Sequence, residues 1–143
     1  MRVNGRWLPD ASGTLCPTMR VWVQAQGGRW QEVDFLVDTG ADRTVFSAEL
    51  AADLGLPSTT AVELSGVGGS ASSVWVTRSL RLLRDDGGAI TLKSDFRGLT
   101  QLSALDSSLL GRDVLDHFTV IIDRPHNVVC LLAERHQYTI QFV

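Results

Sequence analysis

Residues 33–47 read VDFLVDTGADRTVFS, and this stretch decides the fold. An apolar run typical of a buried strand leads directly into Asp38. Burying a charge without partners is costly, so an acid at this place needs donors close by. Thr39 offers a hydroxyl group, and Gly40 lets backbone amides approach the carboxylate closely. The stretch predicts a strand, a sharp turn that holds the acid, and a short helix after Ser47.

Taken alone, the triplet Asp38-Thr39-Gly40 is a weak pattern. Many strands end in an Asx-type turn that uses the same residue types. The triplet is therefore open to two interpretations, a plain turn or an acid prepared for chemistry. Two further segments bear on the choice.

The first is residues 62–76, VELSGVGGSASSVWV, which read as two strands joined by a glycine-rich tip. Such a tip suits a flap that opens for a polypeptide, closes over it and excludes water. The alternative is an ordinary glycine-rich hairpin turn. A dinucleotide-binding loop is excluded, because the last glycine of G-x-G-x-x-G is missing and no long helix follows. Trp75, on the returning strand, either covers the cleft or packs in a core.

The second is residues 109–123, LLGRDVLDHFTVIID. Its first three residues, Leu109 to Gly111, are expected to pack tightly against the strand that carries Asp38. We predict that Arg112 pairs with Asp42, because a guanidinium fork matches a carboxylate. The alternative for Arg112 is a solvated arginine at the start of a helix.

The rest of the chain reads as short β-rich runs between turn signals. We predict one domain over residues 1–143, an all-β barrel or sandwich with short helices at Ser47 to Leu54 and Asp113 to His117. Turns are predicted at residues 27–28, 85–88 and 124–127. The predicted strands are Met19 to Gln24, Trp30 to Val37, Val62 to Ser65, Val74 to Leu83, Ile90 to Leu92, Thr119 to Ile122, Val128 to Leu132 and Tyr138 to Val143.

Composition narrows the possible partners. The chain has 143 residues and a net charge of -3, and it lacks the basic excess that nucleic acids attract. No stretch approaches the roughly 20 apolar residues that span a bilayer, and the first residues lack a signal-peptide core. We therefore expect a cytoplasmic protein without a membrane segment. Cys16 and Cys130 match no zinc or redox spacing and are expected to be reduced thiols.

The three segments together, over about residues 33–123, resemble the retropepsin family of retroviral-type aspartic proteases. Three motifs occur in the family's order: Asp38-Thr39-Gly40-Ala41-Asp42, the flap tip Gly66-Val67-Gly68-Gly69, and Leu110-Gly111-Arg112-Asp113. The resemblance implies an all-β fold with a closed barrel, one short helix near the C-terminal third and a homodimeric assembly. It implies an aspartic endopeptidase that cleaves polypeptides without a metal or other cofactor.

Carried over residue by residue, the resemblance implies that Asp38 holds the nucleophilic water, Thr39 braces the paired loops and Gly40 contacts substrate. Ala41, Asp42 and the flap-tip residues Gly66, Val67, Gly68 and Gly69 would line the substrate cleft. Gly111 and Arg112 would support the site, Arg112 by holding Asp42. Because Ala41 replaces a hydroxyl residue of some relatives, we expect activity from mildly acidic toward neutral pH.

This mechanism needs two carboxylates that share one proton. The chain offers one suitable motif, because Asp10-Ala11-Ser12-Gly13 has an inserted residue and Asp106-Ser107-Ser108 lacks the glycine. A two-fold dimer would supply the second Asp38. Tyr138 to Val143 is the candidate interface strand, and the alternative is a last strand paired within one subunit.

A second hypothesis keeps the fold and drops the chemistry: a catalytically idle dimerisation or peptide-binding module. A different hydrolase is a weaker interpretation. The chain has no G-x-S-x-G elbow, and His117, His126 and His136 lack metalloprotease spacing.

Overall fold

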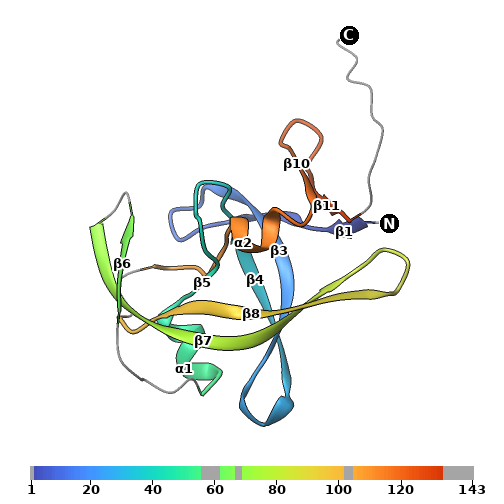
Figure 1. Ribbon diagram of the computed structural model, residues 1–143. Coiled ribbons are helices and arrows are strands. Elements are labelled where there is room, and N and C mark those ends of the chain that lie inside the picture. Colours follow the sequence, from blue (N-terminus) through green and yellow to red (C-terminus); the bar gives the residue numbers. More distant parts are fainter. Residues whose placement is uncertain (1, 56–61, 67–68, 102–104, 134–143) are drawn as a thin grey trace.

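The computed structural model of the chain describes residues 2–55, 62–66, 69–101 and 105–133 (Figure 1). Strands dominate, and the helices are the short α1 (Ala48–Asp53), α2 (Arg112–Leu115) and the 3-10 turn η1 (Gln26–Gly28). The strands are β1 (Arg2–Asn4), β2 (Arg6–Pro9), β3 (Leu15–Gln24), β4 (Trp30–Val37), β5 (Val45–Phe46), β6 (Val62–Gly66), β7 (Gly69–Leu83), β8 (Ala89–Leu99), β9 (Leu109–Leu110), β10 (Thr119–Asp123) and β11 (Val128–Leu132).

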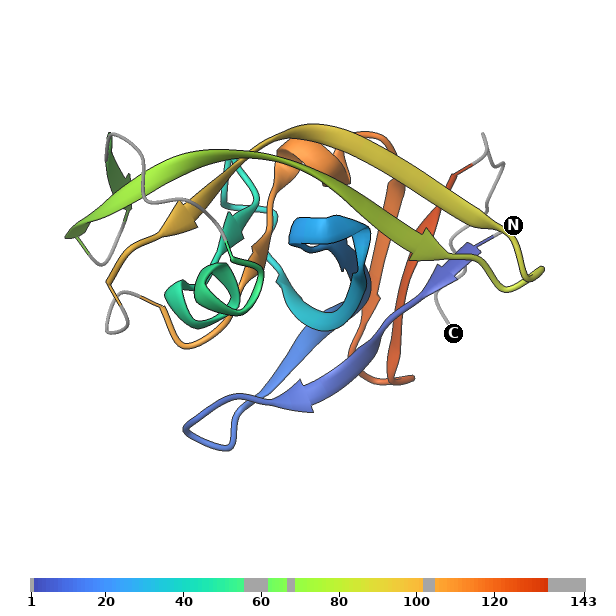
Figure 2. The same cartoon turned by 90° about the horizontal axis from the view of Figure 1, so that it is seen from below.

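Most strands belong to one sheet with the order β2-β3-β4-β9-β5-β8-β7-β6. Strand β7 also pairs with β3, so the path from β3 through β4, β9, β5, β8 and β7 returns to its start. Figure 2 shows the long β7–β8 hairpin arching over β3 and β4. A smaller sheet, ordered β1-β11-β10, lies beside this arrangement.

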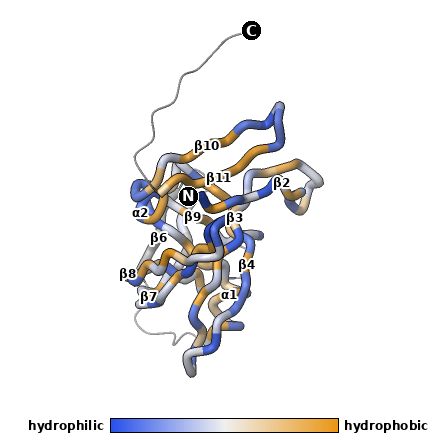
Figure 3. Tube along the Cα trace, turned by 90° about the vertical axis from the view of Figure 1, so that its right-hand side faces the viewer, coloured by the Kyte–Doolittle hydropathy of each residue, from blue (hydrophilic) through white to orange (hydrophobic). Residues whose placement is uncertain are grey.

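The core is aliphatic with three phenylalanine rings at its centre. Phe35, Phe46 and Phe96 are fully buried, and the ring of Phe46 lies 5.9 Å from that of Phe35 and 5.6 Å from that of Phe96. These rings come from β4, β5 and β8, so aromatic packing joins the strand before Asp38 to the segments that follow it. Figure 3 shows β10 and β11 as largely hydrophobic and the turn between them as hydrophilic.

The predicted elements that fall within the described residues are present, with differences in length. Strands β4 and β11 have the predicted bounds, and Ser47 caps α1 by accepting a hydrogen bond from the backbone N–H of Leu50. Strand β8 is much longer than the predicted Ile90 to Leu92. Polar residues interrupt its apolar pattern, whereas main-chain pairing with β7 continues from Ala89 to Leu99. Strands β1, β2, β5 and β9 were not predicted, and the predicted strand Tyr138 to Val143 lies outside the described residues.

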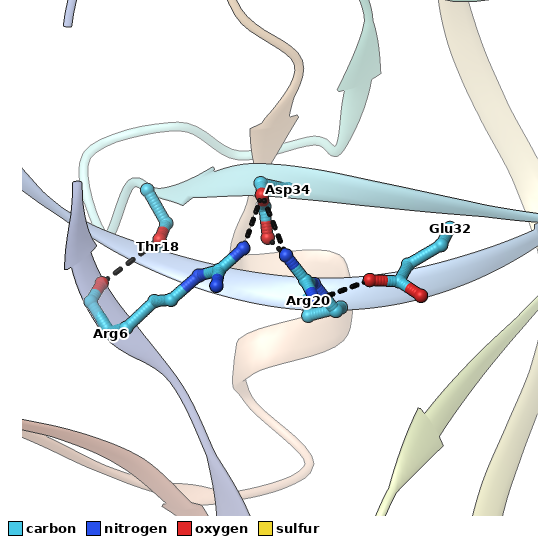
Figure 4. Close-up of polar contacts among 5 residues, drawn as sticks. All are labelled: Arg6, Thr18, Arg20, Glu32 and Asp34. Carbon is cyan, nitrogen blue, oxygen red and sulfur yellow. Dashed lines mark hydrogen bonds and ion pairs between the residues drawn. The ribbon is translucent and has the colours of Figure 1, made fainter. Parts of the chain in front are cut away.

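A group of charged residues ties β2 to the neighbouring strands β3 and β4 (Figure 4). Asp34 accepts hydrogen bonds from Arg6 at 2.8 Å and from Arg20 at 3.2 Å, and Arg20 also pairs with Glu32. The hydroxyl of Thr18 donates to the carbonyl of Arg6 at 2.9 Å. Each exposed pair is worth roughly 0–1 kcal/mol, so the group orients β2 more than it stabilises the fold.

Cys16 is half-buried, Cys130 is buried, and neither forms a disulfide. No helix in the described part of the chain is long and apolar enough to span a bilayer. Among the same residues, no group of histidine, cysteine and acidic side chains is arranged to hold a metal ion.

Candidate active site

Asp38 stands immediately after β4, in a turn that its own side chain helps to form. The backbone N–H of Gly40 donates to Asp38 Oδ1 at 3.0 Å, and the N–H of Ala41 donates to the Asp38 carbonyl at 3.2 Å. Asp38 is half-buried, whereas Thr39 and Gly40 are exposed. A Cβ atom at Gly40 would lie 3.3 Å from Asp38 Oδ1, so a side chain would crowd the carboxylate. The turn therefore presents a partly exposed acid on a buried strand.

Residues 110–113 close this turn from the other side. The Asp38 N–H donates to the carbonyl of Leu110 at 3.1 Å, and the N–H of Arg112 donates to the carbonyl of Ala41 at 2.9 Å. The fully buried Leu110 also pairs with Val37 in the parallel β4–β9 ladder. The loop that carries Asp38 is thus held at both ends by backbone hydrogen bonds, which position it independently of side-chain chemistry.

Gly111 has no room for a side chain. A Cβ atom there would lie 2.4 Å from the carbonyl carbon and oxygen of Arg43 and 2.8 Å from the backbone nitrogen of Thr44. The neighbours are backbone atoms, which cannot rotate away as a side chain would. Leu109 and Leu110 pair with β4 as expected, whereas Gly111 packs against the backbone of Arg43 and Thr44, a contact that only glycine permits.

Thr44 and Asp113 form the polar centre of this support, and the sequence reasoning missed them. Thr44 is fully buried, and both its backbone N–H and its hydroxyl donate to Asp113 Oδ1, at 2.8 and 2.7 Å. The Thr44 hydroxyl in turn accepts from the N–H of Gly111 at 3.0 Å. The sequence carries no local signal for this pair, because Thr44 follows the charged residues Asp42 and Arg43 and its partner lies 69 residues away.

Arg112 forms an ion pair with Asp42, as predicted, and the two residues come from opposite sides of the closed loop. The pair is exposed, with 50% of the Arg112 side chain and 79% of the Asp42 side chain accessible to solvent. Because water screens such a pair, it contributes little to stability compared with the buried Thr44–Asp113 contacts.

A second missed contact fixes the start of α1. The backbone N–H of Ser47 donates to the hydroxyl of Ser108 at 3.0 Å, and both serines are buried. The Ser47 hydroxyl accepts from the Leu50 N–H at 3.3 Å and so caps the helix. Ser108, just before β9, thereby supports the start of α1, which follows the Asp38 loop in the chain.

The predicted hairpin is formed by β6 and β7, which pair antiparallel from Val62↔Ser73 to Gly66↔Gly69. Val67 and Gly68, at the predicted flap tip, lie outside the described residues. Trp75 does not pack in the core: it is 43% exposed, and the guanidinium of Arg97 lies over its ring at 3.7 Å.

The sequence profile of the family described as aspartyl protease matches residues 20–114, more than half of the chain, and the chain belongs to this family of retropepsin-like aspartic proteases.

One solved structure shares the fold of this chain, and a second is less similar. The crystal structure of a retropepsin-like aspartic protease from Rickettsia conorii matches with a TM-score of 0.56 and 20% identity, over 92% of this chain and 97% of that one. The EIAV protease complexed with the inhibitor HBY-793 matches with a TM-score of 0.48 and 22% identity, over 71% of this chain and 86% of that one. Among curated proteins, none matches the sequence.

Proposed function

We propose that this chain is an aspartic endopeptidase in which the Asp38 residues of two copies together activate the hydrolytic water. The observation that carries the proposal is the placement of Asp38: half-buried at the end of β4, braced by the Gly40 N–H, in a loop closed by Leu110 and Arg112. A held, partly exposed acid is what general acid–base catalysis requires. Membership of the aspartyl protease family supports the same role.

In this mechanism one Asp38 carboxylate takes a proton from water while the other, protonated, polarises the scissile carbonyl. Water adds to the carbonyl carbon, and the leaving amine takes up a proton as the C–N bond breaks. Two carboxylates a few ångströms apart cannot both ionise easily, so the pair carries the single shared proton that the reaction needs.

The second carboxylate comes from a second copy of the chain. Asp10 is not suited to the role, because it is engaged in its own turn, where the N–H of Ser12 and the N–H of Thr14 both donate to it at 2.9 Å. Asp106 is exposed and lacks a neighbouring glycine. A symmetric dimer gives each copy the same role, and the proposed interface strand is Tyr138 to Val143, which lies outside the described residues.

The other site residues have supporting roles in this proposal. Thr39 braces the two Asp38 loops against each other, and Gly40, Ala41 and Asp42 contact the bound peptide. The hairpin of β6 and β7 closes over the peptide through the tip Gly66-Val67-Gly68-Gly69. Gly111 and Arg112 hold the loop in place. An extended peptide would pair its backbone with these segments, while alternate side chains enter pockets.

The test is cleavage of a diverse peptide mixture between pH 4 and 7, with new termini identified by mass spectrometry. The Asp38→Asn variant should cut nothing. Asp10→Asn is the matched control, because it alters an equally turn-bound aspartate outside the site and should retain the cleavage pattern. Sedimentation should find the active protein dimeric, and mixing it with excess Asp38→Asn chain should reduce the rate through mixed dimers.

If the unmodified protein cuts nothing while it is folded and dimeric, the proposal is wrong. The alternative, an idle dimerisation or peptide-binding module, would then account for the chain. In that case the Asp38→Asn variant should bind peptides as well as the unmodified protein does.

A further inference from the structure

Two arginine side chains meet at one exposed tryptophan beside the Asp38 loop. The guanidinium of Arg97, on β8, lies 3.7 Å from the ring centre of Trp75, on β7, and that of Arg43 lies 5.8 Å from it. We call these three residues the arginine–tryptophan cluster. Cation–π contact holds a guanidinium flat against an aromatic ring and leaves its edge N–H groups directed outward as donors.

The positive charge of the cluster lacks a carboxylate partner among the residues that the structure describes. Neither Arg43 nor Arg97 forms an ion pair there, in contrast to Arg112 with Asp42. Among the described residues, the side chain of Arg97 donates one hydrogen bond, to the Ser73 hydroxyl at 3.3 Å. The nearby acid on β8, Asp95, accepts from the Thr77 hydroxyl instead.

The cluster joins two segments that have site roles in the proposed function. Arg43 directly follows Asp42 in the Asp38 loop, and the backbone N–H of Arg97 donates to the carbonyl of Thr44 at 3.3 Å. Trp75 lies on the strand that begins at the flap residue Gly69. A peptide held between loop and flap would therefore pass the cluster.

We infer that the arginine–tryptophan cluster is a binding site for the carboxylate of a glutamate or aspartate side chain of the substrate. This inference rests on the proposed function, since the ligand is part of the bound polypeptide. The chemistry follows from the donors: two guanidiniums beside one indole offer in-plane N–H groups to an oxyanion, and a neutral or cationic side chain leaves their charge unmatched. The enzyme would prefer an acidic residue at one position near the scissile bond.

Peptide binding tests the inference separately from catalysis. The probes are fluorescein-labelled peptides that each carry one glutamate at a defined position, with glutamine counterparts, bound to the Asp38→Asn protein and followed by fluorescence anisotropy. At one position glutamate should bind roughly fivefold more tightly than glutamine, as one partly exposed charge pair allows.

Variants of Arg43 test whether the preference for glutamate depends on the arginine–tryptophan cluster. Added to Asp38→Asn, Arg43→Gln should remove the preference for glutamate, Arg43→Lys should retain part of it, and Arg43→Glu should favour lysine at the same position. Arg81→Gln is the matched control. Arg81 lies on β7, as Trp75 does, and its guanidinium stacks on Trp30 at 4.0 Å, but among the described residues it has no contact with the Asp38 loop. It should leave the preference unchanged.

The inference is overturned if glutamate and glutamine peptides bind equally or not at all, or if the preference survives Arg43→Gln. It is also overturned if Arg81→Gln removes the preference to the same extent, since bulk charge would then be the cause. Failure of the proposed function is a different result. In that case the unmodified protein cleaves no peptide, while an Arg43-dependent preference in binding can still be measured.

Discussion

Asp113 Oδ1 accepts both the backbone N–H and the hydroxyl of Thr44, which lies 69 residues earlier in the chain. These bonds connect the first turn of α2 to the loop that leaves Asp38. Because Thr44 is fully buried, neither donor can turn to water if the carboxylate is removed. The position of the Asp38 loop therefore depends on Asp113, which has no role in the proposed reaction.

Asp113→Ala should lower the free energy of unfolding by about 2 kcal/mol, because two buried donors lose their acceptor. Chemical denaturation followed by circular dichroism measures the change. Asp116→Ala, an exposed aspartate at the end of the same helix, is the control and should change stability by about 0.5 kcal/mol or less. Equal stability of the two variants would contradict the role given to Asp113.

The pair Arg112–Asp42 should behave differently, because both side chains are largely exposed. A double-mutant cycle of Arg112→Gln and Asp42→Asn should give a coupling energy below about 1 kcal/mol. The coupling should shrink further at high salt, since exposed charges are screened. A salt-independent coupling of several kcal/mol would mean that the pair is buried in the functional assembly.

Gly111→Ala should destabilise the fold by about 3 kcal/mol, because the new methyl group would overlap backbone atoms of Arg43 and Thr44. Thermal unfolding measures the loss, and peptide cleavage should fall with it as the Asp38 loop shifts. Gly87→Asn provides the comparison. Gly87 has a φ of 83° in open space, a conformation that asparagine tolerates, so this variant should remain close to the unmodified protein. A stable Gly111→Ala protein would contradict the close contact.

Acid should weaken the turn at Asp10. The hydroxyl of Ser12, with help from the Thr14 N–H, lowers the pKa of Asp10 below its ordinary value of 3.8. A lowered pKa in the folded state means that the carboxylate stabilises the fold fully above the ordinary value and loses this effect as the pH falls through the folded value. Asp10→Asn should therefore be less stable than the unmodified protein near neutral pH.

The difference in the free energy of unfolding between Asp10→Asn and the unmodified protein should disappear below about pH 4. There Asp10 becomes protonated in both the folded and the unfolded state of the unmodified chain. Urea unfolding at a series of pH values measures it, with Asp53→Asn as an exposed aspartate for comparison. A difference that stays constant down to strongly acidic pH would mean that the turn does not depend on the charge of Asp10.

The sequence alone predicted β4 and β11 with their full bounds, and the physical reason is local. Trp30–Val37 and Val128–Leu132 are apolar runs between turn residues, and their bounds agree with the prediction. Strands β5 and β9 have two residues each, which is too short for any period to appear, and they exist because distant partners pair with them.

The candidate site likewise contains residues with a local sequence signal and residues without one. Asp38, Gly111 and Arg112 were identifiable because each is an unusual residue for its place, an acid, a glycine or a cation beside apolar runs. Thr44 and Ser108 are ordinary residues whose importance comes from burial and from partners far along the chain. Such pairings have no local signature, so only the folded structure brings them out.

The hydrogen bonds from residues 110–113 also set the order in which the site can form. The acid and its turn are synthesised early, whereas the segment that closes the loop follows about half the chain length later. During synthesis the Asp38 loop cannot be closed until Asp113 has left the ribosome, and contacts of this separation form late in folding as well. A nascent or truncated chain that ends before Gly111 thus carries the acid but lacks the hydrogen bonds that hold its turn.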